Sequence, residues 1–238
     1  MSRFTRITCK SREEWLQNRT GGIGGSGAAA IIGLNPWKTN VEYWEETLGL
    51  KEPEDISAKP VVKYGLAAEE HLRELLKLDF PQFEVYHSDY EVLTFNKLPF
   101  LRASLDGEIN VLENCIFEGQ ALTKGMRGVL EIKTTEVLNS MSRENWKNAI
   151  PQNYYCQVLH YLFITNYDFA IVVAQLKYDY QDSMRKSTQH YIVMKKDKIG
   201  DIKYLINAEV DFWNNYVLTK TKPALILNNT VLENERFK

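Results

Sequence analysis

The stretch VLEIKTTEV, residues 129–137, places two charged side chains in what otherwise has the composition of a buried strand. The two-residue period of a β-strand puts Leu130 and Ile132 on one face and Glu131 and Lys133 on the other. Charged side chains rarely lie deep in a core unless they are paired or bind a ligand. The strand therefore has an apolar face and a face that is able to do chemistry.

A second carboxylate is expected to join the first. Asp106 ends a predicted strand at a turn, and if that strand pairs with the later one across the insertion at residues 113–128, Asp106 and Glu131 converge on one point. Hard divalent cations such as Mg²⁺ take oxygen ligands of this kind, often with a backbone carbonyl, here that of Ile132, and waters. The ammonium of Lys133 beside a metal-bound water favours hydroxide and orients it for attack on a phosphodiester.

A Glu-x-Lys tripeptide also occurs by chance, and a solvent-facing edge strand with a cross-strand ion pair is the alternative. Glu69 adds a second indication. It lies on one helical stripe with Leu72 and Leu76, the buried side of a predicted helix. Contact with the metal site, directly or through water, would explain an acid there; the alternative is a boundary carboxylate that extends to solvent.

The helix that follows Pro151 carries a polar and aromatic face formed by Tyr154, Gln157 and Tyr161. Such a face suits contact with a phosphate or a sugar, whereas a Gln157 that satisfies a buried backbone group is the alternative. Aromatic residues at element boundaries usually belong to the core, but some could stack on bases or separate a duplex end. The candidates are Trp37, Trp44 and Trp146.

The elements that must position these residues alternate between helix and strand. Before the insertion, short helices are predicted over 26–32 and 40–50, a longer helix over 64–80, and strands over 83–95 and 99–112. The apolar face of the longer helix comprises Ala68, Leu72, Leu75 and Leu76. After the strand at 126–137, the expected order is a helical region over 142–166, a central strand over 167–179, a hairpin loop over 180–189, a strand over 190–197 and a helix over 199–218.

Bulk properties limit the class of protein. The chain has 238 residues, 29 basic and 31 acidic, so no overall positive field indicates a polyanionic partner and any DNA must be held locally. Three widely spaced cysteines argue against a disulfide scaffold and favour a reducing cytosol. No apolar run is long enough to span a bilayer, so no membrane partner is expected. We expect a single domain over 1–238, with a helical N-terminal part over about 1–60 and a tail over about 221–238.

The glycine-rich segment GGIGGSG, residues 21–27, is not a nucleotide-binding loop. No Gly-Lys-Ser/Thr follows it, as a P-loop requires, and no strand is predicted before it, as a Rossmann fingerprint requires. Its glycines are expected to let the backbone turn tightly beside a phosphate. A flexible turn before a helix is the alternative.

Four segments together resemble a known family. They are RTGGIGGSGAAAIIGLNPWKT, YGLAAEEHL, ASLDG followed by LEIKTT, and IPQNYYCQVLHYL. In this order they are similar to the YqaJ-type viral recombinase nucleases, relatives of the lambda exonuclease within the PD-(D/E)xK superfamily. The first and last segments are the most specific, because neither belongs to the generic superfamily signature. Leu105 stands where the strict motif has proline, a variation that the superfamily tolerates.

The resemblance implies an α/β fold with a PD-(D/E)xK (restriction-endonuclease-like) core, a central mixed sheet flanked by helices. It implies that Asp106 and Glu131 are metal ligands together with the carbonyl of Ile132, that Lys133 is the catalytic lysine, and that Glu69 is an additional acid. The implied cofactor is Mg²⁺, with Mn²⁺ as a substitute.

The implied activity is a metal-dependent exonuclease, a deoxyribonuclease that degrades one strand of linear double-stranded DNA from the 5′ end. It leaves a 3′ tail for a single-strand annealing recombinase partner. Members of the lambda type bind the terminal 5′ phosphate, and the matching positions are Arg19, Ser26, Ser104 and Gln157, beside Tyr161. The resemblance also implies a homo-oligomer, for which a trimeric ring is one candidate, and phage or prophage origin, hence the cytoplasm of a bacterial host.

Two alternatives stay open at this stage. The catalytic residues fix phosphodiester hydrolysis but not a requirement for a DNA end, so an endonuclease or DNA-repair nuclease on the same fold is one. A non-catalytic DNA-binding protein that retains the fold is the other, although binding alone would not need Asp106, Glu131 and Lys133 together.

Overall fold

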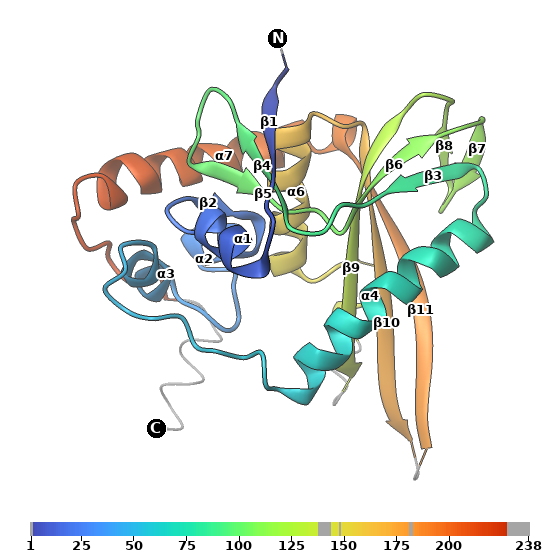
Figure 1. Ribbon diagram of the computed structural model, residues 1–238, viewed down its shortest axis with the longest axis horizontal. Helices are drawn as coiled ribbons and strands as arrows, with labels where there is room; N and C mark the ends of the chain where they lie inside the picture. The colour runs from blue at the N-terminus through green and yellow to red at the C-terminus, as the bar shows by residue number, and fades with distance from the viewer. Residues whose placement is uncertain (1, 138–143, 148, 181–182, 228–238) are drawn as a thin grey trace.

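The computed structural model describes residues 2–137, 144–147, 149–180 and 183–227. Within this part of the chain, the strands form a five-stranded sheet of order β11-β10-β9-β6-β3, a four-stranded sheet of order β1-β4-β5-β2 and a β7-β8 hairpin (Figure 1). The larger sheet consists of β3 (Phe83–Tyr86), β6 (Gly107–Val111), β9 (Arg127–Val137), β10 (Phe169–Tyr180) and β11 (Ser183–Met194). The smaller sheet consists of β1 (Phe4–Thr8), β2 (Ile23–Gly24), β4 (Glu91–Phe95) and β5 (Leu101–Ala103). The hairpin consists of β7 (Cys115–Phe117) and β8 (Gln120–Leu122).

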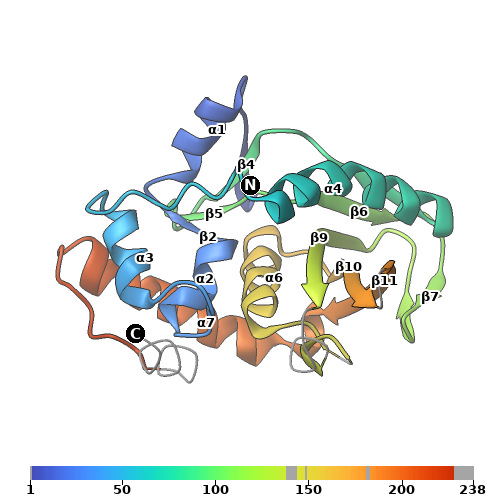
Figure 2. The same cartoon turned by 90° about the horizontal axis from the view of Figure 1, so that it is seen from below.

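The larger sheet is mixed, as the sequence predicts, because β9 and β10 are parallel while its other neighbouring strands are antiparallel. The helices are α1 (Arg12–Arg19), α2 (Gly25–Ile31), α3 (Asn40–Thr47), α4 (Pro60–Asp79), α6 (Gln152–Thr165) and α7 (Ile199–Phe212). Two shorter helical segments are η1 (Lys195–Asp197) and η2 (Trp213–Val217). Figure 2 shows α4 along one side of strands β9 to β11 and α7 on the other.

The alternation of side chains along β9 divides the core into two layers. Leu130 and Ile132 pack with Leu72 and Leu76 of α4, whereas Val129 packs with the α6 and α7 side of the sheet. Strands buried on both faces lack the simple apolar and polar alternation of a half-exposed sheet. Glu131 and Lys133 of β9 therefore point into protein on the α6 side, where only pairing or ligand binding makes such burial tolerable.

The N-terminal segments form a layer against α6. α3 begins with a capping box between Thr39 and Glu42, and α2 packs closely against α6. The C-terminal segment crosses this layer, where the buried Asn40 side chain donates to the carbonyl of Ala224 and accepts from the amide of Ile226. No helix in the described residues has the length and apolar character needed to cross a membrane.

Several predicted elements differ in the structure. The predicted strand 83–95 is two strands in different sheets, β3 and β4, separated by a turn in which Tyr90 has a φ of 56°. The prediction of a hairpin loop over 180–189 is wrong for most of that range, because β11 begins at Ser183. Leu75, predicted to belong to the buried face of α4, is exposed. Each error comes from a local pattern that did not include the neighbouring element.

Two further differences concern the N-terminal half. β1 and β2 lie within the part expected to be helical, and β1 pairs with β4, far away in sequence. Asp106 does not end a strand; it lies in the link between β5 of the smaller sheet and β6 of the larger one. The helical region predicted over 142–166 is helical at residues 144–145 and again in α6, which begins directly after Pro151. Its residues 142–143 and 148, like tail residues 228–238, lie outside the described part.

Candidate active site

The pairing of β6 with β9 brings the two predicted metal ligands together. The strands are antiparallel with Gly107 opposite Leu130, so Asp106, one residue before β6, lies beside Glu131. The Asp106 carboxylate accepts a hydrogen bond from the backbone amide of Ile132 through Oδ2, at 2.7 Å. On the opposite side of the link, Arg73 of α4 donates from Nε to the carbonyl of Asp106 at 3.0 Å. The position of this carboxylate is thus fixed from β9 and from α4.

The Glu131 carboxylate is almost completely buried, with 1% of its side chain exposed. Its Oε1 atom accepts from Nζ of Lys133 and, at 2.7 Å, from Nε2 of Gln157 on α6. Its Oε2 atom is buried without a hydrogen-bond partner among the described residues. A buried carboxylate oxygen without a partner costs free energy unless a ligand satisfies it.

The Lys133 ammonium lies between acids and an aromatic ring. It contacts Glu131, and its Nζ lies 4.9 Å from the centre of the Tyr154 ring. Burial lowers the pKa of Lys133, but the carboxylates of Glu131 and Asp106 raise it more, so the net shift is upward. Lys133 is therefore a cation in this arrangement, and 20% of its side chain is accessible to solvent.

Glu69 lies half-buried on α4, close enough to the site for its charge to matter. Burial and the Asp106 carboxylate raise the pKa of Glu69 to about 7, while Lys133 and Arg73 oppose the shift. Burial and the same Asp106 carboxylate raise the pKa of Glu131 to about 8. The three acids therefore repel one another, which is the condition that a divalent cation relieves.

The residues present fit a hard cation with few protein ligands. The oxygen donors are Asp106, the unpartnered Oε2 of Glu131 and the carbonyl of Ile132, a set that suits Mg²⁺ completed by water and substrate oxygens. Among the described residues there is no group of three or more His, Cys, Asp or Glu side chains arranged to hold a metal.

Two of the residues predicted to bind the 5′ phosphate, Arg19 and Ser104, are connected through Trp15, which the sequence did not indicate. The Arg19 guanidinium lies 4.2 Å from the centre of the Trp15 ring, and Trp15 Nε1 donates to Ser104 Oγ at 3.2 Å. One indole thus supports two predicted phosphate ligands. A signal was present, since a spacing of four residues on α1 puts Trp15 and Arg19 on the same face.

The glycine-rich segment brings α2 onto α6. A Cβ atom on Gly25 would lie 2.5 Å from Cε1 of Tyr161, so only glycine allows this approach. Ser26 follows and is exposed. The amide nitrogen of Gln157 is engaged by two side chains, since it donates to Glu131 and, at 3.0 Å, to the hydroxyl of Tyr161. Gln157 therefore orients the Glu131 carboxylate in this structure.

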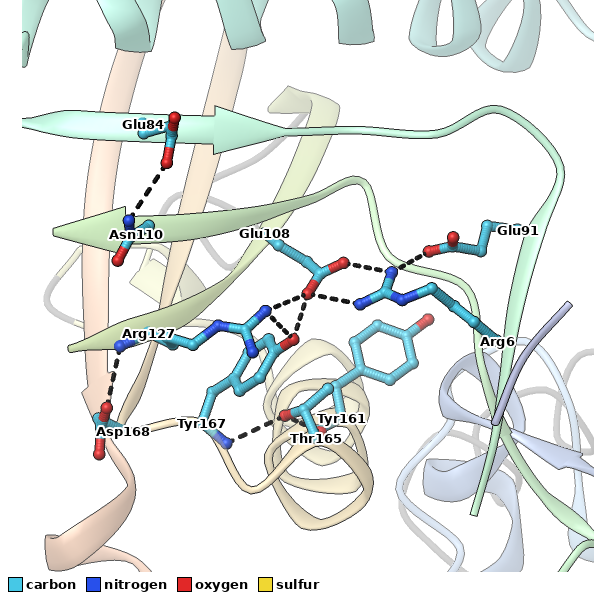
Figure 3. Close-up of polar contacts among 10 residues, drawn as sticks. All are labelled: Arg6, Glu84, Glu91, Glu108, Asn110, Arg127, Tyr161, Thr165, Tyr167 and Asp168. Atoms are coloured by element: carbon cyan, nitrogen blue, oxygen red, sulfur yellow. Dashed lines mark hydrogen bonds and ion pairs between the residues drawn. The ribbon is translucent and has the colours of Figure 1, made fainter. Parts of the chain in front are cut away.

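Glu108 is a second buried acid that the sequence reasoning missed, because it follows Asp106 and Gly107 as an ordinary strand residue. It accepts from both terminal nitrogens of Arg6, at 2.6 and 3.0 Å, from Nη2 of Arg127 at 3.0 Å and from the hydroxyl of Tyr167 (Figure 3). These contacts join β1 of the smaller sheet to β6 and β9 of the larger one. Glu108 therefore has a structural role next to the site.

Comparison with solved structures identifies the fold. The alkaline exonuclease LHK-Exo from Laribacter hongkongensis superposes with a TM-score of 0.57 and 19% identity, covering 87% of this chain and 95% of that one. The same exonuclease in complex with dAMP gives a TM-score of 0.56 with 18% identity and the same coverage. A KSHV SOX RNA complex gives a TM-score of 0.52 at 10% identity, over 89% of this chain and 72% of the other. The chain thus shares the fold of LHK-Exo, a mixed α/β fold as predicted.

Sequence comparison gives the family. The uncharacterized protein YqaJ of Bacillus subtilis (strain 168) is 29% identical over 226 residues, which is 90% of this chain. The chain spans 59% of the length of that relative. The model of the YqaJ-like viral recombinase domain matches residues 14–168, a range that includes Asp106, Glu131 and Lys133. The chain therefore belongs to the YqaJ-like viral recombinase domain family.

Proposed function

We propose that this protein is a Mg²⁺-dependent exonuclease that hydrolyses one strand of linear double-stranded DNA from the 5′ end. The observation that carries the proposal is the convergence of Asp106, Glu131 and Lys133 at one point of the sheet, with Oε2 of Glu131 buried and unpartnered. An ion pair on an exposed edge strand would show neither the burial nor the second acid. The fold shared with alkaline exonucleases supports the same activity.

Each residue has a distinct task in this proposal. Asp106 and Glu131, with the carbonyl of Ile132, hold the cation, and Gln157 keeps the Glu131 carboxylate in place. Mg²⁺ bound there would supply Lewis-acid stabilisation of charge on the phosphate oxygens and lower the pKa of its water. Lys133 offers a positive charge at the same point, which orients the attacking water and stabilises charge that develops on the phosphate.

We assign the requirement for a DNA end to the residues around Trp15. Arg19 is suited to clamp a terminal phosphate through two parallel hydrogen bonds, and its stacking on Trp15 restricts its position. Ser26 on α2 and Ser104 in the link after β5 would contribute hydroxyls. A phosphate at the 5′ end of the degraded strand would then set the register of the next phosphodiester over Asp106 and Glu131.

The products of this reaction are 3′ single-stranded tails, the substrate for a strand-annealing recombinase. We extend the proposal to such a partner and to a ring-shaped homo-oligomer around DNA, which would keep the enzyme on one duplex. Sedimentation with and without duplex DNA tests the second point directly. A protein that sediments as a monomer under both conditions would contradict the ring-shaped oligomer.

The experiment that tests the proposed activity compares three DNA substrates in Mg²⁺. A linear duplex with 5′ phosphates, the same duplex with 5′ hydroxyls and a covalently closed circle are digested while each strand carries its own label. We expect loss from the 5′ ends only, fastest on the phosphorylated duplex, with the circle intact. Equal cleavage of the circle would instead establish an endonuclease.

A further inference from the structure

Trp37 has an unusual combination of exposure and fixed geometry. It is 72% exposed, whereas Trp44 and Trp146 are buried at 6% and 4%. Its loop is held by Asn35, whose side-chain oxygen accepts from the amides of Trp37 at 2.9 Å and Lys38 at 3.1 Å. Lys38 in turn pairs with Glu46 of α3. The Trp37 indole is therefore exposed to solvent on a turn that these contacts hold in place.

The Trp37 ring belongs to a run of aromatic rings that ends at the catalytic lysine proposed above. Its centre lies 6.3 Å from that of Tyr154, and Tyr154 in turn lies 5.6 Å from Trp146 and 4.9 Å from Nζ of Lys133. Trp146 is buried against Tyr191 of β11, so the run has a rigid base in the core. Its outer member, Trp37, is the ring that is largely exposed.

We propose that Trp37 is a stacking platform for a DNA base near the duplex end, one ring removed from Lys133, an inference that rests on the nuclease function proposed above. Every base has a π-face, so a ring in this position contacts DNA without selecting its sequence. Successive bases rise by about 3.4 Å along a strand. The base on Trp37 therefore belongs to one of the few nucleotides next to the phosphodiester that is cut.

The geometry favours a base over a protein partner. The platform is a single indole whose neighbour Tyr154 contacts Lys133, and Lys133 in turn pairs with Glu131; these surroundings suit a nucleotide whose phosphate lies at the proposed cation site. A protein partner would require a broad apolar surface, because stable interfaces bury about 800 Å² on each side. Stacking on Trp37 would hold the terminal nucleotides apart from their complement and guide one strand to the metal.

The test uses blunt hairpin duplexes that carry 2-aminopurine at one of the first four positions of either strand, with Ca²⁺ in place of Mg²⁺ so that binding occurs without cleavage. In the wild-type chain we expect the probe's fluorescence to change on binding at one or two adjacent positions. Trp37→Ala should remove that change and weaken binding to duplex ends roughly tenfold, while Trp37→Tyr should retain most of both. Tyr204→Ala, which removes an aromatic side chain that is 67% exposed on α7, is the matched control and should behave as wild type.

The possible results separate this inference from the proposed function. If wild type and Trp37→Ala bind duplex ends with the same affinity and the same fluorescence change while both cut DNA in Mg²⁺, the stacking role is wrong and the nuclease stands. If the wild-type chain neither binds nor cuts duplex DNA, both proposals fail. If Trp37→Ala alters only the sedimentation coefficient, Trp37 contacts a second copy of the chain and the stacking role is again wrong.

Discussion

Gln157 donates a hydrogen bond from Nε2 to Oε1 of Glu131 over 2.7 Å, and Lys133 donates to the same oxygen. Both donors therefore approach Glu131 from one side and leave Oε2 as the oxygen that is buried and unpartnered. This asymmetry means that the Glu131 carboxylate presents one particular oxygen, Oε2, to a ligand. It also makes α6, the helix that carries Gln157, part of the proposed metal site without supplying a ligand to it.

Replacing Gln157 with leucine removes the donor that orients Glu131, so Mg²⁺ should bind more weakly. We expect the Mg²⁺ concentration for half-maximal cleavage to rise about 10- to 100-fold, with a smaller effect on the rate at saturating Mg²⁺. The measurement is a Mg²⁺ titration of cleavage. Gln152→Leu on the exposed first turn of α6 is the matched control. An unchanged Mg²⁺ requirement in Gln157→Leu would contradict this role.

Removing the Trp15 ring should disturb Arg19 and Ser104 together. Trp15→Ala is expected to lower the preference for a 5′ phosphate over a 5′ hydroxyl by about tenfold, comparable to losing one hydrogen bond to a charged group. Trp15→Phe keeps a ring under Arg19 but not the donor to Ser104, so its effect should be smaller. Competition between the two substrates measures the preference. Full retention of the preference by Trp15→Ala would show that the phosphate binds elsewhere.

Glu108 ties the two sheets together, so its removal should reduce stability rather than catalysis. Glu108→Ala leaves the guanidinium groups of Arg6 and Arg127 without their shared carboxylate. We expect the free energy of unfolding to fall by about 3 kcal/mol. Glu84→Ala, which removes an exposed acid on the neighbouring strand β3, should change it by less than about 0.5 kcal/mol. Equal losses in urea unfolding would contradict the special role of Glu108.

His160 and Glu209 form a fully buried pair that should make stability depend on pH. Nδ1 of His160 lies 2.9 Å from a Glu209 oxygen, and Nε2 lies 2.9 Å from the carbonyl of Arg102, which can only accept. Burial lowers the pKa of His160, but the Glu209 carboxylate and the hydrogen bonds outweigh it and raise the pKa above the usual value of 6.5. The folded chain therefore holds a proton that the unfolded chain releases first.

The sign of the pH effect follows from this order. Below about pH 6.5 both states carry the proton and the stabilisation is complete; as pH rises from there through the folded pKa, the stabilisation is lost. The free energy of unfolding of wild type, minus that of His160→Gln, should thus be larger at pH 6 than at pH 8. Urea unfolding at both values gives the difference. A difference that is constant or grows with pH would contradict the charged pair.

The convergence of Asp106, Glu131 and Lys133 could be predicted because strand periodicity is a local property of the sequence. The alternation in residues 129–137 put Glu131 and Lys133 on one face, and one antiparallel pairing was enough to place Asp106 nearby. The link at Asp106 was harder, since residues 99–112 look like one continuous strand with a turn. In the structure, residues 99–112 contribute strands to two different sheets. The evidence for this is that β5 pairs with β4, whereas β6 pairs with β9.

The contacts that support the site were not predictable from local patterns. Arg6 and Glu108 are separated by 102 positions, and Trp15 and Ser104 by 89, so no helical or strand period relates them. Tyr161 and Gln157 could be placed on one face of α6, but not their distance from β9. Leu75 has the period of a buried residue and is exposed because no element covers that side of α4 at its position among the described residues.

The most direct test of the account is the rate at which Lys133→Ala degrades a 5′-phosphorylated linear duplex in Mg²⁺, compared with wild type. Lys133 contacts Glu131, the proposed metal ligand, and brings a positive charge to the site, so we expect the rate to fall by about 10²- to 10³-fold. Duplex binding in Ca²⁺ and thermal unfolding serve as controls for the fold. A variant that binds DNA normally and cuts it at the wild-type rate would contradict the assignment of Asp106, Glu131 and Lys133 as the catalytic centre.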